Sequence, residues 1–450
     1  MQRIEVKNFG PLKDINLEIK DYMVFIGPQA SGKSTLAKLI YFFWKVEDKF
    51  RQEILPTYIG NLLTKTHREE VNYAETFKGD IRKLISDFFP TIRNGNISYF
   101  YNNEYSISID LTLYSLRGKE DIQLSSGFIN EINEVDQKIK SSPSLTNLLR
   151  QQKIDLDDFI KILSNDILSN STETVKTERV YIPAGRIILS ILSNSFQLVE
   201  SNSLDYFNES LIRFTNKVRK FLTSPDHNNL FGRDAIILPY RGEEDIFSLC
   251  NRLSFKILKG DFHIGDNGDG IMQYHNNSGY VIPLKHTSSG QQESSWLINV
   301  IQYILAESDA NGYDIIIEEP EAHLFPDAQR DMTKLITLLS SPDSEKKTRI
   351  IVTTHSPYIL ATLNNSIKAF STAQIENKAE EVEKILSKEF WIDPKNLFVG
   401  FMNKNEGEDN FGIQDIFDQE SGLIDHEVLD KVSDDIIKQF DDLLDIQYSE

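Results

Sequence analysis

The chain has 450 residues and a formal net charge of −20, and it is 40% hydrophobic and 26% charged. This length and apolar content allow one large domain or two to three smaller ones. A single cysteine, Cys250, excludes disulfide frameworks and cysteine-based zinc sites, so we expect a cytoplasmic protein. No run of 18 or more apolar residues occurs and the polar N-terminal stretch does not resemble a signal peptide, so we expect no membrane span.

Acidic residues are concentrated toward the C-terminus. Residues 371–450 hold 21 Asp and Glu against 7 Lys and Arg, a net charge of −14. An acidic chain repels phosphate backbones, so the composition argues against nucleic-acid binding, although a local basic patch stays compatible with it. The acidic segment is either a solubilising surface or a docking surface for a basic partner.

The first hundred residues change pattern several times. Alternating apolar residues over 4–19 predict a two-stranded ribbon, and the run "YMVFIG" (22–27) predicts a buried strand. From Thr35 the apolar spacing becomes helical, and residues 46–95 read as amphipathic helix. The segment 96–114 alternates around an Asn-Asn turn and predicts a hairpin.

The middle of the chain is mainly helical. The patterns predict helix over 126–175 and over most of 186–222, with a short buried strand at 179–185 between them. Strand-like pieces separated by glycine turns occupy 252–284. One of these turns, "DNGDG" (266–270), lacks the far acidic residue of a calcium loop, so we interpret it as a hairpin turn.

The sequence "GPQASGKS" (27–34) fits G-x-x-x-x-G-K-[ST] and lies between a predicted strand and a predicted helix. Such a loop turns successive N–H groups toward phosphate oxygens, and the helix N-terminus adds its dipole. Lysine in this motif reaches the outer phosphates, and the serine hydroxyl suits Mg²⁺. The predicted ATP-binding residues are Gly27, Pro28, Gln29, Ala30, Ser31, Gly32, Lys33, Ser34 and Thr35.

A doubled glutamate follows a second buried strand in "YDIIIEEPEAHLFPDAQR" (313–330). At the C-terminal end of a parallel strand, Glu318 would face the phosphate loop and hold Mg²⁺ together with Ser34. Glu319 points differently and would polarise the attacking water. Pro320 ends the strand, and Pro326 is well placed to start the next helix.

A third apolar strand, "TRIIVTTHSPYIL" (348–360), places His355 just beyond its end. In a parallel arrangement with the preceding strand, this histidine lies on the edge where ligands bind. An imidazole there can donate a hydrogen bond to the γ-phosphate or to the attacking water. His355 is therefore predicted to act in catalysis with Glu319.

The segment "TSSGQQE" (287–293) precedes another helix and has two interpretations. Ser289 and Gln292 fit a capping box, which is a structural role. A helix N-terminus with exposed serine hydroxyls also suits phosphate, and one phosphate loop is already present at 27–34. The second site would then serve the nucleotide of another copy. The predicted residues of this second site are Ser288, Ser289, Gly290 and Gln291.

Taken together, "GPQASGKS", "SSGQQ", "IIIEEPEAHLFP" and "VTTHSP" resemble the ATP-binding-cassette (ABC) ATPase heads of the SMC and OLD-like class. The resemblance covers roughly residues 1–45 and 250–360. It implies an α/β head, with a mixed phosphate-loop sheet and an antiparallel lobe, that dimerises around ATP and Mg²⁺. Departures are Thr287 and Ser289, where the class often has Leu and Gly, and Glu318 in place of Asp.

The resemblance divides the chain into four parts. The head comprises 1–115 and 251–370, a mainly helical insertion occupies 116–250, and an acidic segment follows at 371–450. No glutamine loop is evident, and "YIPAGR" (181–186) is a candidate for its place. Arg186 would then touch nucleotide or a neighbouring subunit; the alternative is a purely structural arginine.

Within the class, "EEPEAHLFP" and "YIPAGR" resemble OLD-like ATPases of anti-phage systems, in which a TOPRIM nuclease often follows the head. About 90 residues follow His355, without a cluster that matches a nuclease. The resemblance therefore implies an ATPase subunit that controls a separate nuclease or toxin, as in Septu or PARIS systems. An SMC-like ATPase acting on DNA is the main alternative; a transporter subunit and a small-molecule kinase fit less well.

Overall fold

The computed structural model describes residues 1–58, 72–112, 121–141, 177–192, 205–231, 245–274, 279–307, 312–341, 347–404, 410–425, 438–441 and 443. Parts of the helical segments predicted at 46–95, 126–175 and 186–222 therefore lie outside the described residues. So does much of the acidic end of the chain.

The central layer is a six-stranded sheet that contains the strand before the phosphate loop. In spatial order its strands are β14 (Gly412–Asp415), β13 (Leu397–Asn403), β3 (Tyr22–Ile26), β12 (Lys347–Thr354), β11 (Gly312–Glu318) and β7 (Thr177–Ile182). All are parallel except β14, which pairs antiparallel at one edge. Because parallel strands end at the same edge, the residues that follow β3, β11 and β12 are brought together.

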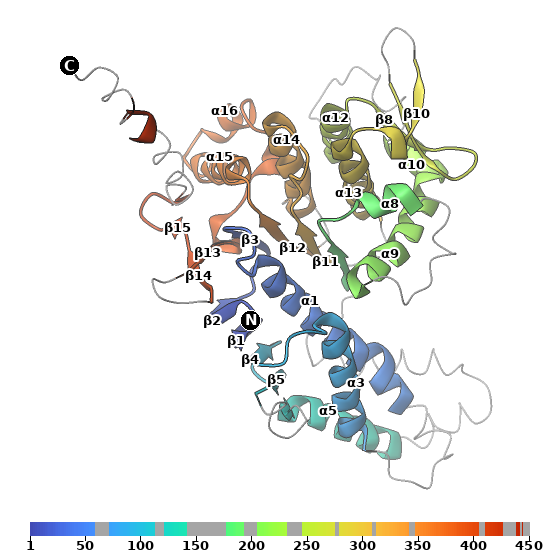
Figure 1. The fold of residues 1–450 in the computed structure, drawn as a ribbon, viewed down its shortest axis with the longest axis vertical. Coiled ribbons are helices and arrows are strands. Elements are labelled where there is room, and N and C mark those ends of the chain that lie inside the picture. Colours follow the sequence, from blue (N-terminus) through green and yellow to red (C-terminus); the bar gives the residue numbers. More distant parts are fainter. Residues whose placement is uncertain are drawn as a thin grey trace.

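Helices cover both faces of this sheet (Figure 1). All five residues of β3 are buried, and alternate ones enter two different cores, which explains the continuous apolar run in the sequence. Helix α1 (Lys33–Lys49) packs in one core. The core on the other face is formed with α9 (Tyr206–Leu222), α12 (Ile246–Leu258), α13 (Ser289–Ala306), α14 (Pro326–Thr337) and α15 (Pro357–Ala373).

An antiparallel sheet packs against α1 and confirms the predicted ribbon and hairpin. Its order is β2 (Leu12–Glu18), β1 (Arg3–Phe9), β4 (Asn96–Phe100), β5 (Ser106–Asp110) and β6 (Asp121–Leu124). Beside it lie the π-helical turn η1 (Phe50–Ile54), α3 (Tyr73–Phe88) and α5 (Ser126–Ser141). The rings of Phe77 and Phe128 each lie 5.0 Å from that of Phe50, so aromatic packing joins these helices.

The remaining elements are short. A three-stranded antiparallel sheet has the order β10 (Val281–Pro283), β9 (Gly270–Gln273) and β8 (Asp261–Ile264). The β8–β9 connection is the predicted hairpin turn, in which the Gly265 N–H donates to the Asp269 carbonyl at 2.8 Å. The others are α8 (Ile187–Leu192), α10 (Pro225–Phe231), α16 (Ala379–Glu383), β15 (Phe417–Asp418), β16 (Leu423–Ile424) and 3₁₀ turns at Leu284–His286, Leu338–Ser340, Lys388–Phe390 and Pro394–Asn396.

The predicted α/β class, with a mixed phosphate-loop sheet and an antiparallel sheet, is confirmed. Two segments that the sequence grouped apart from the head nevertheless join its central sheet. Strand β13, from the acidic segment, pairs directly with β3, and β7, from the helical insertion, pairs with β11. In the part of the chain that the structure describes, no helix is long and apolar enough to cross a membrane.

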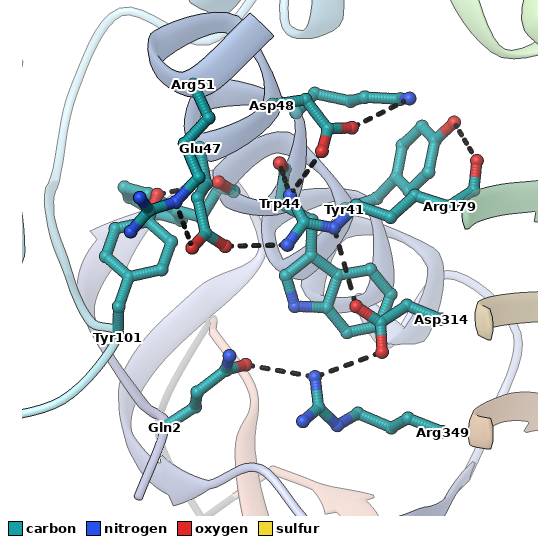
Figure 2. Close-up of polar contacts among 12 residues, drawn as sticks. Gln2, Tyr41, Trp44, Glu47, Asp48, Arg51, Tyr101, Arg179, Asp314 and Arg349 are labelled. Carbon is teal, nitrogen blue, oxygen red and sulfur yellow. Dashed lines mark hydrogen bonds and ion pairs between the residues drawn. The ribbon is translucent and has the colours of Figure 1, made fainter. Parts of the chain in front are cut away.

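A largely buried ionic network ties α1 to the central sheet (Figure 2). Arg179 on β7 donates to Glu47 at 2.6 Å and to Asp48 at 2.8 Å, both on α1. It also contacts Asp314 on β11 at 3.4 Å, and Arg349 on β12 reaches the same carboxylate at 3.2 Å. The helix that follows the phosphate loop is therefore fixed to three of the strands.

Candidate nucleotide-binding site

The phosphate loop connects β3 to α1 and depends on two glycines. Gly27 and Gly32 have φ values of 152° and 92°, which residues other than glycine rarely adopt. A Cβ at Gly27 would lie 2.8 Å from the Met402 carbonyl oxygen, and one at Gly32 would lie 2.6 Å from the Leu12 side chain. The glycines of the motif are therefore required by backbone conformation and by close neighbours.

The N-terminus of α1 is open toward the loop. Its N-cap is Gly32, so no side chain accepts from its first N–H groups. Lys33 is buried, and its Nζ donates to the carbonyls of Gly27 at 2.9 Å and Pro28 at 2.7 Å. An uncapped helix end with an adjacent lysine is an anion-binding arrangement.

Glu318 is the last residue of β11 and is buried. Strand alternation puts it on the same face of the sheet as Ile316, which packs in the core that contains α1. Its carboxylate accepts from the Tyr181 hydroxyl at 2.7 Å and from the Ala184 N–H at 3.2 Å. Burial and the adjacent carboxylate raise the pKa of the Tyr181 hydroxyl, so it stays a hydrogen-bond donor.

Glu319 and His355, which the sequence places 36 positions apart, meet at this edge. Glu319 has a left-handed φ of 43°, and its N–H donates to the Thr353 carbonyl at 2.8 Å. The His355 Nε2 lies 3.6 Å from a Glu319 carboxylate oxygen, and both side chains are partly exposed. A partly exposed acid paired with an imidazole is able to orient and deprotonate a water molecule.

A third acid, Glu321, belongs to the same turn and was not predicted. Its Oε1 accepts from the Thr354 hydroxyl and from the His355 N–H, both at 2.7 Å. Burial lowers the pKa of Lys33, while Glu319 and Glu321 act in the opposite direction. Phosphate loop and acidic turn therefore influence each other electrostatically. The "EEPE" spacing offered a signal for this residue.

The segment before α13 forms a capping box, shifted by one residue from the prediction. Ser288, not Ser289, is the N-cap, and its hydroxyl accepts from the Gln291 N–H at 3.3 Å. The Gln291 side chain accepts from the Ser288 N–H at 3.4 Å and donates to the Leu258 carbonyl at 2.6 Å. Ser288 and Ser289 are exposed. Helix α13 is buried on nearly all sides.

A contact within the same chain explains why position 290 is a glycine. A Cβ there would lie 2.6 Å from the His323 carbonyl oxygen, in the turn that follows β11. This contact joins segments that are distant in the sequence. The glycine allows α13 to approach the acidic turn closely.

Arg186, the candidate for nucleotide contact, is buried and has a structural role. Its Nη1 donates to the carbonyls of Pro183 at 3.1 Å and Glu318 at 2.6 Å, and its Nη2 donates to the Glu319 carbonyl at 3.1 Å. The guanidinium also lies 3.7 Å from Glu293 on α13. Of the two interpretations, the structural one accounts for these contacts.

Comparison with known proteins gives a family and distant relatives. The AAA ATPase domain family matches residues 1–240 and 200–360. A protein named OLD nuclease, from Thermus scotoductus, is 22% identical over 376 residues, which are 81% of this chain and 60% of that protein. The chain thus spans less than two thirds of that relative.

Solved structures of low similarity include two SMC heads. One, bound to the C-winged helix domain of ScpA, aligns with a TM-score of 0.40 and 12% identity over 94% of this chain and 99% of its own. The SMC head domain from Thermotoga maritima gives 0.35 and 9% over 92% and 98%. Because the family match extends over residues 1–360, which is more than half of the chain, the chain belongs to the AAA ATPase domain family.

Proposed function

We propose that this protein binds ATP with Mg²⁺ and hydrolyses it, with Glu319 as the base. The observation that supports this most is the meeting, at one sheet edge, of an uncapped phosphate-loop helix and the Glu319–His355 pair. The family contributes the expectation of an ATPase domain. A site that only bound phosphate would not need the Glu319–His355 pair, and a general base alone would not need the phosphate-loop helix beside it.

The residues fit a magnesium nucleotide. Backbone N–H groups at the start of α1 and the Lys33 ammonium would neutralise phosphate oxygens. Ser34, in the first turn of α1, and Glu318, on the face of the sheet that α1 covers, offer the hard oxygen ligands that Mg²⁺ prefers. The ion would add positive charge beside the transferring phosphate. Within the described residues, no group of three or more His, Cys, Asp or Glu is arranged to hold a metal alone.

Glu319 and His355 would act on the water. The Glu319 carboxylate would orient the nucleophile and accept its proton, while His355 Nε2 would donate to the γ-phosphate or to that water. Glu321 holds the Thr354 hydroxyl and the His355 N–H, which fixes the backbone from which the imidazole projects.

We further propose that a second copy completes the site. Ser288 and Ser289 are exposed at the N-terminus of the 18-residue helix α13, where a helix favours anions. Two copies would then bury two nucleotides, each held by the phosphate loop of one copy and by Ser288, Ser289, Gly290 and Gln291 of the other. Ser288, Gly290 and Gln291 already have contacts within the chain, but Ser288 and Ser289 are exposed, so the serines are the sharper test.

In the cell, the assembly would hold and release a separate effector, a nuclease or toxin, in anti-phage defence. The basis is the resemblance to OLD-like ATPases and the relative named OLD nuclease, of which this chain spans 60%. Co-purification of a protein encoded beside this gene, in ATP but not in ADP, is the expected result. An SMC-like ATPase acting on DNA is the alternative, and it predicts DNA retention on filters with a steep salt dependence.

The test of nucleotide binding and hydrolysis uses three proteins. Wild type is expected to bind ATP and release phosphate, and Lys33→Ala to lose nucleotide binding by about 100-fold or more. Glu319→Gln is expected to bind ATP normally while its turnover falls by about 10²–10⁴-fold. Normal ATP affinity in Lys33→Ala, or normal turnover in Glu319→Gln, contradicts the assigned roles.

The test of the second copy uses Ser288→Arg. This variant is expected to keep ATP binding by single chains but to lose nucleotide-dependent assembly and most of its hydrolysis. Lys285→Arg, a charge-conserving change at an exposed neighbour, is the control that leaves both unaltered. Unchanged hydrolysis in Ser288→Arg would remove the second copy from the site.

A further inference from the structure

The turn that follows β11 is strained. Glu319 has a φ of 43° and His323 a φ of 60°, both in the left-handed region that residues other than glycine seldom occupy. Such conformations persist only where surrounding contacts hold them, and they are common at functional sites. The orientation of the Glu319 carboxylate depends on this backbone, so the contacts that hold it matter for catalysis.

Arg186 supplies contacts on one side of the turn. Its planar guanidinium donates to two successive carbonyls, those of Glu318 at 2.6 Å and Glu319 at 3.1 Å. Two bonds from one rigid fork fix the two successive peptide groups on either side of the Glu319 Cα, which a flexible ammonium is less able to do. The side chain is 1% exposed, so water does not compete for these carbonyls.

Glu293 on α13 is the carboxylate that faces this buried arginine. It is itself buried, with one oxygen 3.7 Å from Arg186 Nη2 and the other 3.7 Å from His323 Nε2. It therefore lies between the arginine that holds one end of the turn and a histidine near the other end. Neither Glu293 Oε2 nor Arg186 Nε has a hydrogen-bond partner among the described residues. The two side chains therefore interact through their charges, and a small movement of α13 would change the distance between them.

Helix α13 also touches the turn directly. Gly290 packs on the His323 carbonyl so closely that an added Cβ would lie 2.6 Å away. Gly290 and Glu293 are three positions apart and share a helix face. That face begins two residues after the Ser288 cap. The end of α13 proposed to meet a second nucleotide is thus in contact with the turn that carries the base.

We propose that Glu293 and Arg186 are positioning residues that hold the Glu319 turn. Through these two residues, the position of α13 relative to the turn determines whether hydrolysis proceeds. This rests on the proposed ATPase function. A contact made by a second copy at Ser288 would alter the position of α13. Because Glu293 lies on α13 and faces Arg186, a shift of the helix would change the contact of Arg186 with the Glu319 carbonyl. Nucleotide binding at the phosphate loop uses neither residue.

The test is the turnover of Glu293→Gln, which keeps the shape of the side chain and removes its charge. We expect kcat to fall about tenfold, the scale of one charge-assisted contact, while the KM and the affinity for ATP stay unchanged. Glu293→Asp, which restores the charge, should recover part of the loss. The matched control is Glu131→Gln, because Glu131 on α5 is also buried and lies 3.3 Å from one arginine, Arg51, in the antiparallel part of the molecule.

Three outcomes overturn the proposal. Wild-type kcat in Glu293→Gln means that its charge does not position the turn. An equal loss in Glu131→Gln means a general effect of losing a buried charge, and a change in ATP affinity without a change in kcat means a binding role. Failure of the ATPase assignment is separately visible, because wild type itself would then release no phosphate.

Discussion

Two arginines with largely buried side chains, Arg179 on β7 and Arg186 seven residues later, differ in how their charge is compensated. Arg179 lies among carboxylates, and although burial lowers its pKa, Glu47, Asp48 and Asp314 raise it above the ordinary value (Figure 2). Arg186 lies mainly among backbone carbonyls, and burial lowers its pKa, with Glu293 the foremost opposing charge. Full charge compensation occurs in the network that joins α1 to the central sheet. Partial compensation occurs beside the strained turn that carries the candidate base.

The largest expected effect is on stability, in Arg179→Met. Removing one partner from a buried ionic network leaves the others unpaired and costs about 3–5 kcal/mol of unfolding free energy. The turnover of the folded fraction should stay within about twofold of wild type, because the network is remote from the reacting groups. Urea unfolding and active-site titration measure the two quantities. A loss of turnover without a loss of stability would contradict the assignment of a stabilising role to Arg179 and a positioning role to Arg186.

Arg186→Lys should show the opposite profile. The lysine keeps the charge but cannot donate to two carbonyls in a fixed geometry, so the base is displaced and kcat falls about 100-fold. Steady-state kinetics beside urea unfolding give the comparison. Normal kcat in this variant would mean that the turn keeps its conformation without the fork.

Gly290→Ala tests the direct contact between α13 and the turn. The new methyl group meets the His323 carbonyl, and overpacking of about 1–3 kcal/mol should displace the turn and lower kcat about tenfold. Gly79→Ala in α3 is the control, because a Cβ there meets nothing within 4 Å; its helix should gain about 1 kcal/mol. Equal kcat in both variants would show that the close approach does not matter for hydrolysis.

The smallest effect concerns pH. Burial alone would raise the pKa of Glu47, but Arg179 and Arg51 lower it overall, so its charged form stabilises the fold. The stability difference between wild type and Glu47→Gln, about 1 kcal/mol at neutral pH, should vanish as the pH falls through the folded-state pKa, below the ordinary value near 4.3. For Glu131, burial raises the pKa, so wild type should instead gain stability relative to Glu131→Gln as the pH falls. Parallel pH curves for both variants would contradict these assignments.

The sequence predicted the parts of the site whose chemistry is local. A strand, a glycine loop and a lysine adjacent in the chain identify the phosphate loop, and strand ends identify Glu319 and His355, which lie 3.6 Å apart in the structure. The hairpins at 96–110 and 261–273 were likewise evident from alternation and turn residues.

The remainder depends on contacts between distant segments. Nothing near Glu293 in the sequence indicates that it faces Arg186, 107 positions earlier, or that Gly290 packs on the carbonyl of His323. The acidic composition of residues 371–450 concealed β13, an apolar strand that pairs with β3. Segment composition averages over such short strands, whereas sheet pairing depends on each residue.

The central claim is that two copies of this chain close around ATP and that Glu319 then hydrolyses it. Light scattering of Glu319→Gln with ATP and Mg²⁺, compared with the same protein without nucleotide, tests it most directly. The account predicts a particle at least twice the mass of the nucleotide-free form, which Ser288→Arg added in the same chain abolishes. A mass unchanged by ATP, with nucleotide demonstrably bound, would contradict it.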